Sequence, residues 1–143
     1  LESQGKTADA IKHYGRALEI DPGYADAHVN IGIALSSMGK NDEAAAHYRE
    51  AIRIKPESVE AHINLADLLV NESRIDEAVG LLREAVSRRT DSAAARNALG
   101  IALARRGDFE GAVGQFQEAL KIDPGNADAR AYLARVRDRM GKF

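Results

Sequence analysis

A fixed period is the feature of this sequence that most constrains its fold. Pro22 and Pro56 lie one period apart, and Pro124 lies two periods beyond Pro56. The one period without a proline ends at Thr90, in the polar turn 89–92. The period is about 34 residues long, which falls in the range of roughly 20–50 residues typical of repeat proteins. In such proteins each unit contacts only its neighbours, so the sequence predicts stacked units, with function in an extended surface rather than in a catalytic cleft.

Each period contains two apolar stripes with helical spacing. The first stripe after Pro22 follows the i, i+3, i+4, i+7 pattern of a buried helix face and consists of His28, Ile31, Gly32 and Leu35. Gly39 comes next and can take the left-handed conformation that ends a helix. The second stripe consists of Ala44, His47, Tyr48, Ala51 and Ile52. Both stripes return one and two periods later, which predicts an all-α chain of helical hairpins.

Composition and charge exclude several functional classes. The chain is 45% apolar but only 5% aromatic and has no Trp, which favours closely packed helices. Without Cys it has neither disulfides nor thiolate metal ligands. It has no apolar run near the roughly 20 residues of a membrane span and no signal-like segment, so we expect no membrane partner and a cytoplasmic location. The net charge of −2 gives no reason to expect nucleic-acid binding. Because the chain starts at Leu1, within a helical pattern, we expect a fragment that could lack a targeting signal.

The spacing of the small, aromatic and proline residues resembles the tetratricopeptide repeat (TPR), a helix-turn-helix unit of about 34 residues, over essentially the whole chain. The residues that carry the resemblance are Gly32, Gly39, Ala44, Tyr48, Ala51 and Pro56. The resemblance implies an α-solenoid, a right-handed superhelix of antiparallel helix hairpins, whose first helices line a concave face that binds a peptide segment of a partner protein. We expect a single TPR domain over 1–143. Its parts are the end of a repeat at 1–22, complete repeats at 25–58, 59–92 and 93–126, and a terminal or capping helix at 127–143.

The four histidines form two pairs by sequence position, His13 with His47 and His28 with His62, and the members of each pair are one period apart. Equivalent positions of stacked repeats are separated by helix layers of roughly 10 Å, too far to share a metal at bonds of about 2 Å. We therefore expect no metal site and no cofactor. The serines lack the glycine-elbow context of a nucleophile, and no glycine-rich phosphate loop is present. The sequence thus predicts a protein that is not an enzyme.

The residues of each first helix that face away from the second helix of the hairpin are the candidate peptide-binding groove. They are Asp26, Val29, Asn30, Ile33, Glu60, Ile63, Asn64, Asp67, Asn97, Ile101, Arg105, Tyr132, Arg135 and Arg139. The early members include three carboxylates and the late members three arginines. We therefore expect an extended peptide of polarised charge, with its acidic part toward the late repeats.

Asn30 and Asn64 occupy equivalent positions, and an amide both donates and accepts hydrogen bonds, so a ladder of Asn can hold a peptide backbone. The stretches 27–32 and 61–66 are similar to repeats of O-linked N-acetylglucosamine transferases, which implies such a ladder. It lapses later, where Ala98 stands in the equivalent position. An ordinary polar role for both amides is the alternative. The two-carboxylate clamp with which TPR cofactors of chaperones bind a partner's C-terminus is not expected. Val29 stands at one of the positions where that clamp requires Lys or Asn.

The function that these observations favour is a protein-interaction module that binds an extended peptide. Two alternatives stay open. One is a self-assembly scaffold that forms homo-oligomers through the repeat ends, and the other is the substrate-recruiting arm of a larger enzyme such as a glycosyltransferase.

Overall fold

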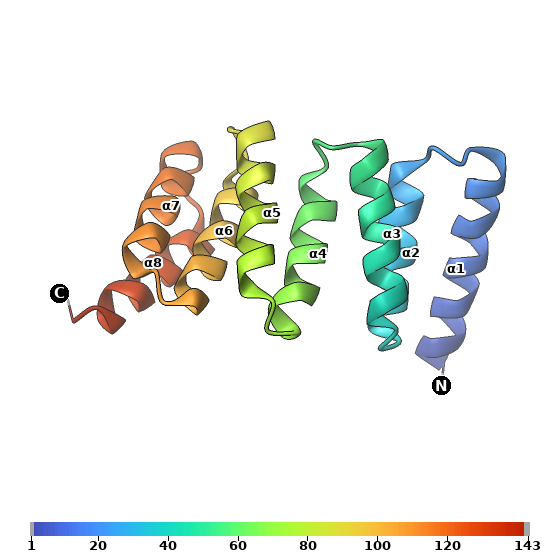
Figure 1. The fold of residues 1–143 in the computed structure, drawn as a ribbon, viewed down its shortest axis with the longest axis horizontal. Coiled ribbons are helices and arrows are strands. Elements are labelled where there is room, and N and C mark those ends of the chain that lie inside the picture. The colour runs from blue at the N-terminus through green and yellow to red at the C-terminus, as the bar shows by residue number, and fades with distance from the viewer. Residues whose placement is uncertain (1, 142–143) are drawn as a thin grey trace. The chain divides into compact units, whose positions relative to one another are not determined.

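The computed structural model describes residues 2–141, and this part of the chain forms eight α-helices joined by short turns (Figure 1). In chain order the helices are α1 (Glu2–Ile20), α2 (Ala25–Ser37), α3 (Asn41–Ile54), α4 (Val59–Asn71), α5 (Ile75–Arg88), α6 (Ala93–Arg106), α7 (Phe109–Ile122) and α8 (Ala127–Arg139). The expected all-α helical-repeat fold is confirmed. The chain divides into two compact units, residues 1–68 (unit 1) and 69–143 (unit 2), and the boundary lies within α4. The prediction of a single domain over 1–143 stays a prediction.

In unit 1, α2 packs against both α1 and α3. The apolar stripes expected from the period form the core of this unit: Ile31 and Leu35 of α2 and Tyr48 of α3 are all at most 5% exposed. Gly32 allows the two helices to approach closely, because a Cβ at this position would lie 2.5 Å from the Tyr48 ring. The hairpin of α2 and α3 is therefore stabilised by the packing of the Tyr48 ring against Gly32.

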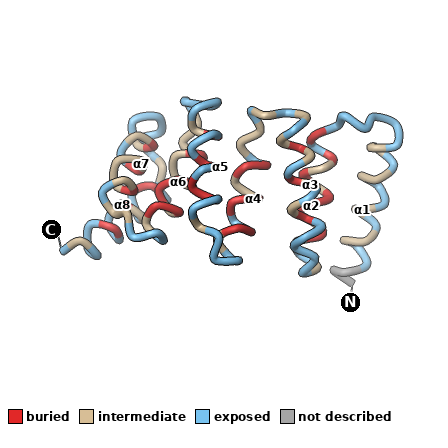
Figure 2. Tube along the Cα trace, in the orientation of Figure 1, coloured by how far each residue is buried: buried red, intermediate tan, exposed pale blue. Residues whose placement is uncertain are grey.

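Unit 2 repeats this packing. In it, α6 packs against α5 and α7, and α8 packs against α7 and α6. Phe116 of α7 is fully buried, and a Cβ on Gly100 of α6 would lie 2.7 Å from its ring. Figure 2 shows buried residues in short stretches along the helices, with exposed residues at the turns. The core of each unit is thus a seam between packed helices.

The first turns of several helices are capped by side chains. Ser92, Asp108 and Asn126 each accept a hydrogen bond from a backbone N–H three residues later, at 3.1, 2.9 and 2.9 Å, so α6, α7 and α8 have side-chain caps. These residue types are preferred at this position because they satisfy backbone donors that the helix leaves unpaired. By contrast, α2, α3 and α5 begin without a side-chain cap.

The turns within the hairpins share a left-handed residue. Gly39, Ser73 and Gly107 occupy the same position in three successive periods and have φ of 78°, 62° and 91°. Serine adopts this conformation less readily than glycine, so Ser73 is a departure from the pattern at a fixed backbone position. Within residues 2–141, no helix has the length and apolar character needed to span a membrane.

Candidate functional site

A hollow of about 420 Å³ lies in unit 2, where α6, α7 and α8 meet. It is lined by apolar and aromatic residues together with three arginines. The lining residues are Ile101, Ala104 and Arg105 of α6, Phe109 and Phe116 of α7, and Tyr132, Arg135, Val136 and Arg139 of α8. Five of these, Ile101, Arg105, Tyr132, Arg135 and Arg139, belong to the groove predicted from the sequence. We call this set of nine residues the C-terminal hollow.

Aromatic rings hold two of the arginines in place. The guanidinium of Arg135 lies over the ring of Tyr132, 5.6 Å from its centroid, and that of Arg139 lies over the ring of Phe109 at 5.9 Å. Tyr132 in turn stacks on buried Phe116, with centroids 5.7 Å apart and planes 14° apart. A cation at this distance from an aromatic face is attracted by the ring quadrupole. The rings therefore orient the charged groups without neutralising them.

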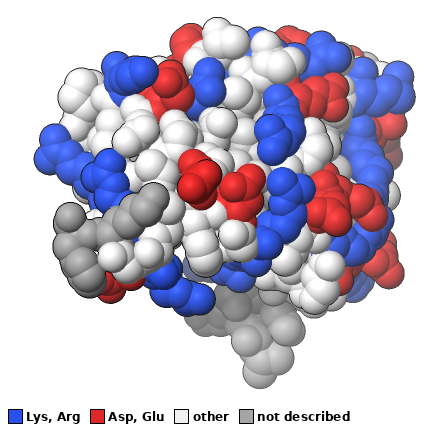
Figure 3. Space-filling view, turned by 60° about the vertical axis from the view of Figure 1, so that its left-hand side comes forward, with Lys and Arg blue, Asp and Glu red and all other residues white. Residues whose placement is uncertain are grey.

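No carboxylate lines the C-terminal hollow, whose nine residues are neutral or basic. The neighbouring Arg106 pairs with Asp76 at 3.3 Å, whereas no carboxylate partner is found for Arg105, Arg135 or Arg139 among the described residues. Figure 3 shows basic and acidic side chains interspersed over the face in view, in keeping with the small net charge. The hollow is thus a local concentration of positive charge next to apolar surface, and Arg105 also borders a second pocket that contains Asp76 and Glu77.

Asn97 has a different environment from the one expected for a groove residue. Its side-chain amide donates to Oδ1 of Asn126 at 3.2 Å, while its own Oδ1 is buried and lacks a partner among the described residues. Oδ1 of Asn126 also caps α8. Asn97 therefore links α6 to the start of α8, and its amide does not join the residues that line the hollow.

The early groove residues lie in unit 1. Val29 is only 2% exposed, so the expectation that its side chain lines an accessible groove is wrong. The reason is that α2 packs against helices on two sides, which covers more of its surface than a hairpin alone would. The other predicted residues of this unit are exposed or half-buried: Asp26, Asn30, Ile33, Glu60, Ile63, Asn64 and Asp67.

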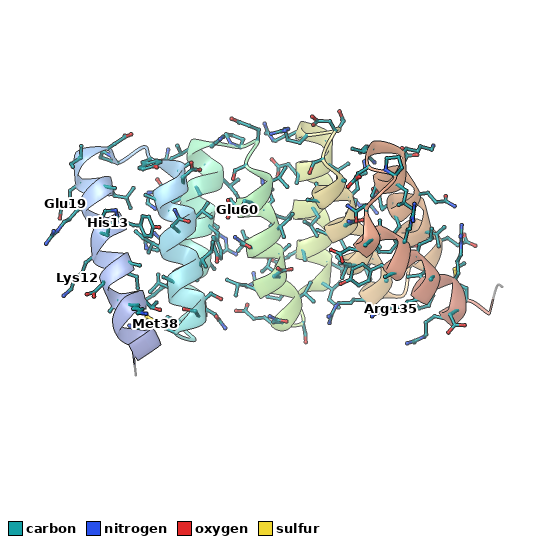
Figure 4. All side chains as sticks on the ribbon, turned by 180° about the vertical axis from the view of Figure 1, so that it is seen from behind. Lys12, His13, Glu19, Met38, Glu60 and Arg135 are labelled. Carbon is teal, nitrogen blue, oxygen red and sulfur yellow. The ribbon has the colours of Figure 1, made fainter. Side chains whose placement is uncertain are left out.

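Two early carboxylates lie near the phenol of Tyr48. Burial raises the pKa of Tyr48, and the negative charges of Asp67 and Glu60 raise it further. Glu60 projects from α4 in Figure 4. These groups give unit 1 an acidic surface next to Tyr48, in contrast to the basic hollow of unit 2.

Sequence reasoning missed four residues of the C-terminal hollow: Ala104, Phe109, Phe116 and Val136. Phe116 lies on a predicted core stripe, so the period assigned it a purely structural role. The sequence signal for Phe109 was that an aromatic residue replaces Asn41 and Ile75 of the preceding repeats, and Phe143 occupies the same position one period later.

Comparison with known proteins agrees with this architecture. A family model described as tetratricopeptide repeat matches residues 29–92 and 63–127, and a model described as TPR repeat matches residues 2–39. Curated protein sequences give no match.

Three solved structures illustrate the proteins that share this fold. The crystal structure of MamA has a TM-score of 0.80 and is 21% identical in sequence. The match covers 98% of this chain and 82% of the MamA chain. YrrB, described as a TPR protein with an unusual peptide-binding site, has a TM-score of 0.73 and 27% identity, covering 99% of this chain and 73% of its own. The first TPR of Spaghetti (RPAP3), solved with the HSP90 peptide SRMEEVD, has a TM-score of 0.75 and 20% identity, covering 82% and 94%.

The matched repeats include most of the chain. This chain therefore belongs to the tetratricopeptide repeat family.

Proposed function

We propose that this chain is a non-catalytic protein-interaction module that binds an extended peptide segment of a partner protein, with the C-terminal hollow as its main contact in unit 2. The observation that carries the proposal is the meeting of five predicted groove residues around one hollow that is lined by three arginines and no carboxylate. YrrB and the first TPR of RPAP3, by their descriptions, bind peptides on the same fold, which supports the same use here.

The chemistry of the hollow favours a peptide that combines carboxylates with an apolar side chain. Three arginines can pair with carboxylates in charge-assisted hydrogen bonds, and the surfaces of Phe109 and Ile101 offer apolar contact. Aromatic residues and arginine are also the types that contribute most to protein interfaces. The segment that fits best is therefore acidic and carries at least one apolar residue.

Unit 1 would contribute separately to the binding of a peptide. Asn30 and Asn64 are half-buried amides, able to contact a peptide backbone, and the nearby Asp26, Glu60 and Asp67 favour a neutral or basic part of the peptide. This is the polarised peptide expected from the sequence.

The proposal predicts that reversing the charge of the hollow weakens the binding of an acidic peptide. We expect the Arg135→Glu and Arg139→Glu double variant to lower the affinity for a labelled peptide rich in Glu with one Phe by about 10-fold or more, since truncating or reversing charges at an interface commonly costs more than about 1.4 kcal/mol. Fluorescence anisotropy at low and high salt measures the loss, which is expected to shrink as salt screens the charges.

Arg137→Glu is the matched control, because Arg137 is an exposed residue of α8 that does not line the hollow. A peptide in which every Glu is replaced by Lys controls for polarity. Asn30→Ala with Asn64→Ala tests the part in unit 1 and is expected to weaken binding further. An equal loss with Arg137→Glu, or equal binding of the acidic and basic peptides, would contradict the assignment of the hollow.

A further inference from the structure

His28 of α2 and His47 of α3 lie side by side in their hairpin, although they do not occupy equivalent positions of the repeat. Nδ1 of His28 and Nδ1 of His47 are 3.1 Å apart. The ring centroids are 5.3 Å apart, which exceeds the nitrogen separation by about the two ring radii, so the two nitrogens face each other directly. Sequence reasoning paired each of these residues with its equivalent one repeat away and missed this contact.

The same pair of positions is in contact in unit 2. There Arg96 and Gln115, two periods after His28 and His47, are joined by a hydrogen bond of 3.4 Å from Nη1 to Oε1. Two independent hairpins thus bring these positions together. The contact between His28 and His47 therefore results from the way in which the two helices of each repeat pack together.

A pair of imidazoles in this arrangement can share one proton between the facing nitrogens. When both rings are neutral, one Nδ1–H donates and the other Nδ1 accepts. One added proton can bind Nε2 of the donor ring, which leaves the bridging hydrogen bond in place and makes it charge-assisted. A second added proton must bind the accepting Nδ1, so two N–H groups and two positive rings would then face each other at the same place. Full protonation is therefore incompatible with the observed contact.

A metal ion fits this geometry less well. Two ligand nitrogens must point at a common ion at about 2.0–2.1 Å, whereas these two point at each other. Among residues 2–141, no group of three or more His, Asp or Glu side chains is placed to hold a metal ion. We therefore expect this pair to bind a proton and not a metal ion.

We propose that His28 and His47 form a proton-sensitive clasp between α2 and α3, which stays closed with one bridging proton and opens when both rings become fully protonated in mild acid.

The surroundings of the pair set the direction of the effect. The pKa of His47 is lowered below 6.5 by burial and by the neighbouring His28, while Glu43 and Glu50 of α3 act in the opposite direction. Glu50 is itself paired with Arg53, which holds the pKa of its carboxyl below the usual range. From α1, which also packs against α2, the charged and histidine side chains are all exposed among those described, and they are Lys6, Asp9, Lys12, His13, Arg16 and Glu19. Figure 4 labels Lys12, His13 and Glu19.

The sign of the pH dependence follows from linkage. Because His47 has a lower pKa when folded than when unfolded, the unfolded chain binds protons more readily. The contribution of the clasp to stability is therefore present above the unfolded value of 6.5 and is lost as the pH falls through the folded pKa. Coupled groups of this kind titrate in two macroscopic steps that belong to the pair.

The test follows both imidazoles by NMR and the free energy of unfolding by urea denaturation between about pH 7.5 and 5, above the range in which carboxylates ordinarily titrate. We expect the two rings to titrate in steps separated by more than about one pH unit, as strongly interacting sites do. The substitution His47→Gln removes one of the two imidazoles and should flatten the pH dependence of stability. A variant carrying His28→Arg and His47→Gln copies the pair of unit 2 and should keep the hydrogen bond while flattening the pH dependence of stability.

His13→Gln serves as the control, since His13 is exposed on α1 (Figure 4) and should leave the pH dependence unchanged. The NMR titration of the unaltered chain decides the matter even if a variant fails to fold. Two independent titrations with ordinary midpoints, or a pH dependence that persists in the Arg–Gln variant, would overturn the clasp.

Discussion

Replacing Phe116 by alanine is expected to lower the free energy of unfolding by about 3–5 kcal/mol, the range measured for large-to-small substitutions of fully buried aromatic residues. Phe116 is fully buried, lies against Gly100 and stacks on Tyr132. Its removal takes apolar surface out of the core and leaves a cavity between α6 and α8 that these helices can fill only partly. Urea denaturation followed by circular dichroism measures the loss.

Phe109→Ala is the matched control, because it removes the same side chain from the same helix at a half-buried position. We expect it to cost less than half as much, since Phe109 loses mainly its contact with Arg139. The more conservative Phe116→Leu should cost about 1–2 kcal/mol, as repacking of similar volume usually does. Similar losses for Phe109→Ala and Phe116→Ala would show that Phe116 is not the anchor of this hairpin.

The addition of a single methyl group at Gly100 is expected to destabilise the chain by about 1–3 kcal/mol, the usual cost of overpacking a core. Alanine is ordinarily more favourable than glycine inside a helix by about 0.5–1 kcal/mol, so the expected sign is opposite to that of helix propensity. The cause is that the new Cβ would lie 2.7 Å from the ring of Phe116, which is buried and cannot move aside.

Gly114→Ala adds the same methyl group in α7, where nothing lies within 4 Å of the new Cβ, and should be neutral or stabilising. The clash itself can be isolated by a double-mutant cycle, in which Gly100→Ala is introduced together with Phe116→Leu. We expect the alanine to cost less beside leucine than beside phenylalanine. A cost independent of the residue at position 116 would contradict the close approach.

The period in the sequence was sufficient to predict the helices, because it is a property of equivalent positions in successive repeats. Contacts within a hairpin instead join positions that are about half a period apart, such as Gly32 with Tyr48 and His28 with His47, and the period alone does not specify these pairs. For this reason Gly32 could be placed on a buried helix stripe, but its aromatic partner Tyr48 could not be assigned to it.

The candidate site was predictable in part for the same reason. The late groove residues could be named because the side of a helix on which a residue lies follows from helical periodicity. Which of those sides stays open depends on neighbouring helices, as the buried Val29 shows. The hydrogen bond of Asn97 to Asn126 depends on where the turn before α8 places a capping side chain, which helical periodicity does not describe.

The caps at the starts of α6, α7 and α8 have a consequence for local motion. A backbone N–H exchanges with solvent when its hydrogen bond opens, and helix ends open more readily than helix centres. At the starts of these three helices a side chain of Ser92, Asp108 or Asn126 already holds one of the otherwise unpaired N–H groups, whereas α2, α3 and α5 begin without this protection. Deuterium should therefore enter the first turns of α2, α3 and α5 sooner than the first turns of α6, α7 and α8, the helices that form the C-terminal hollow.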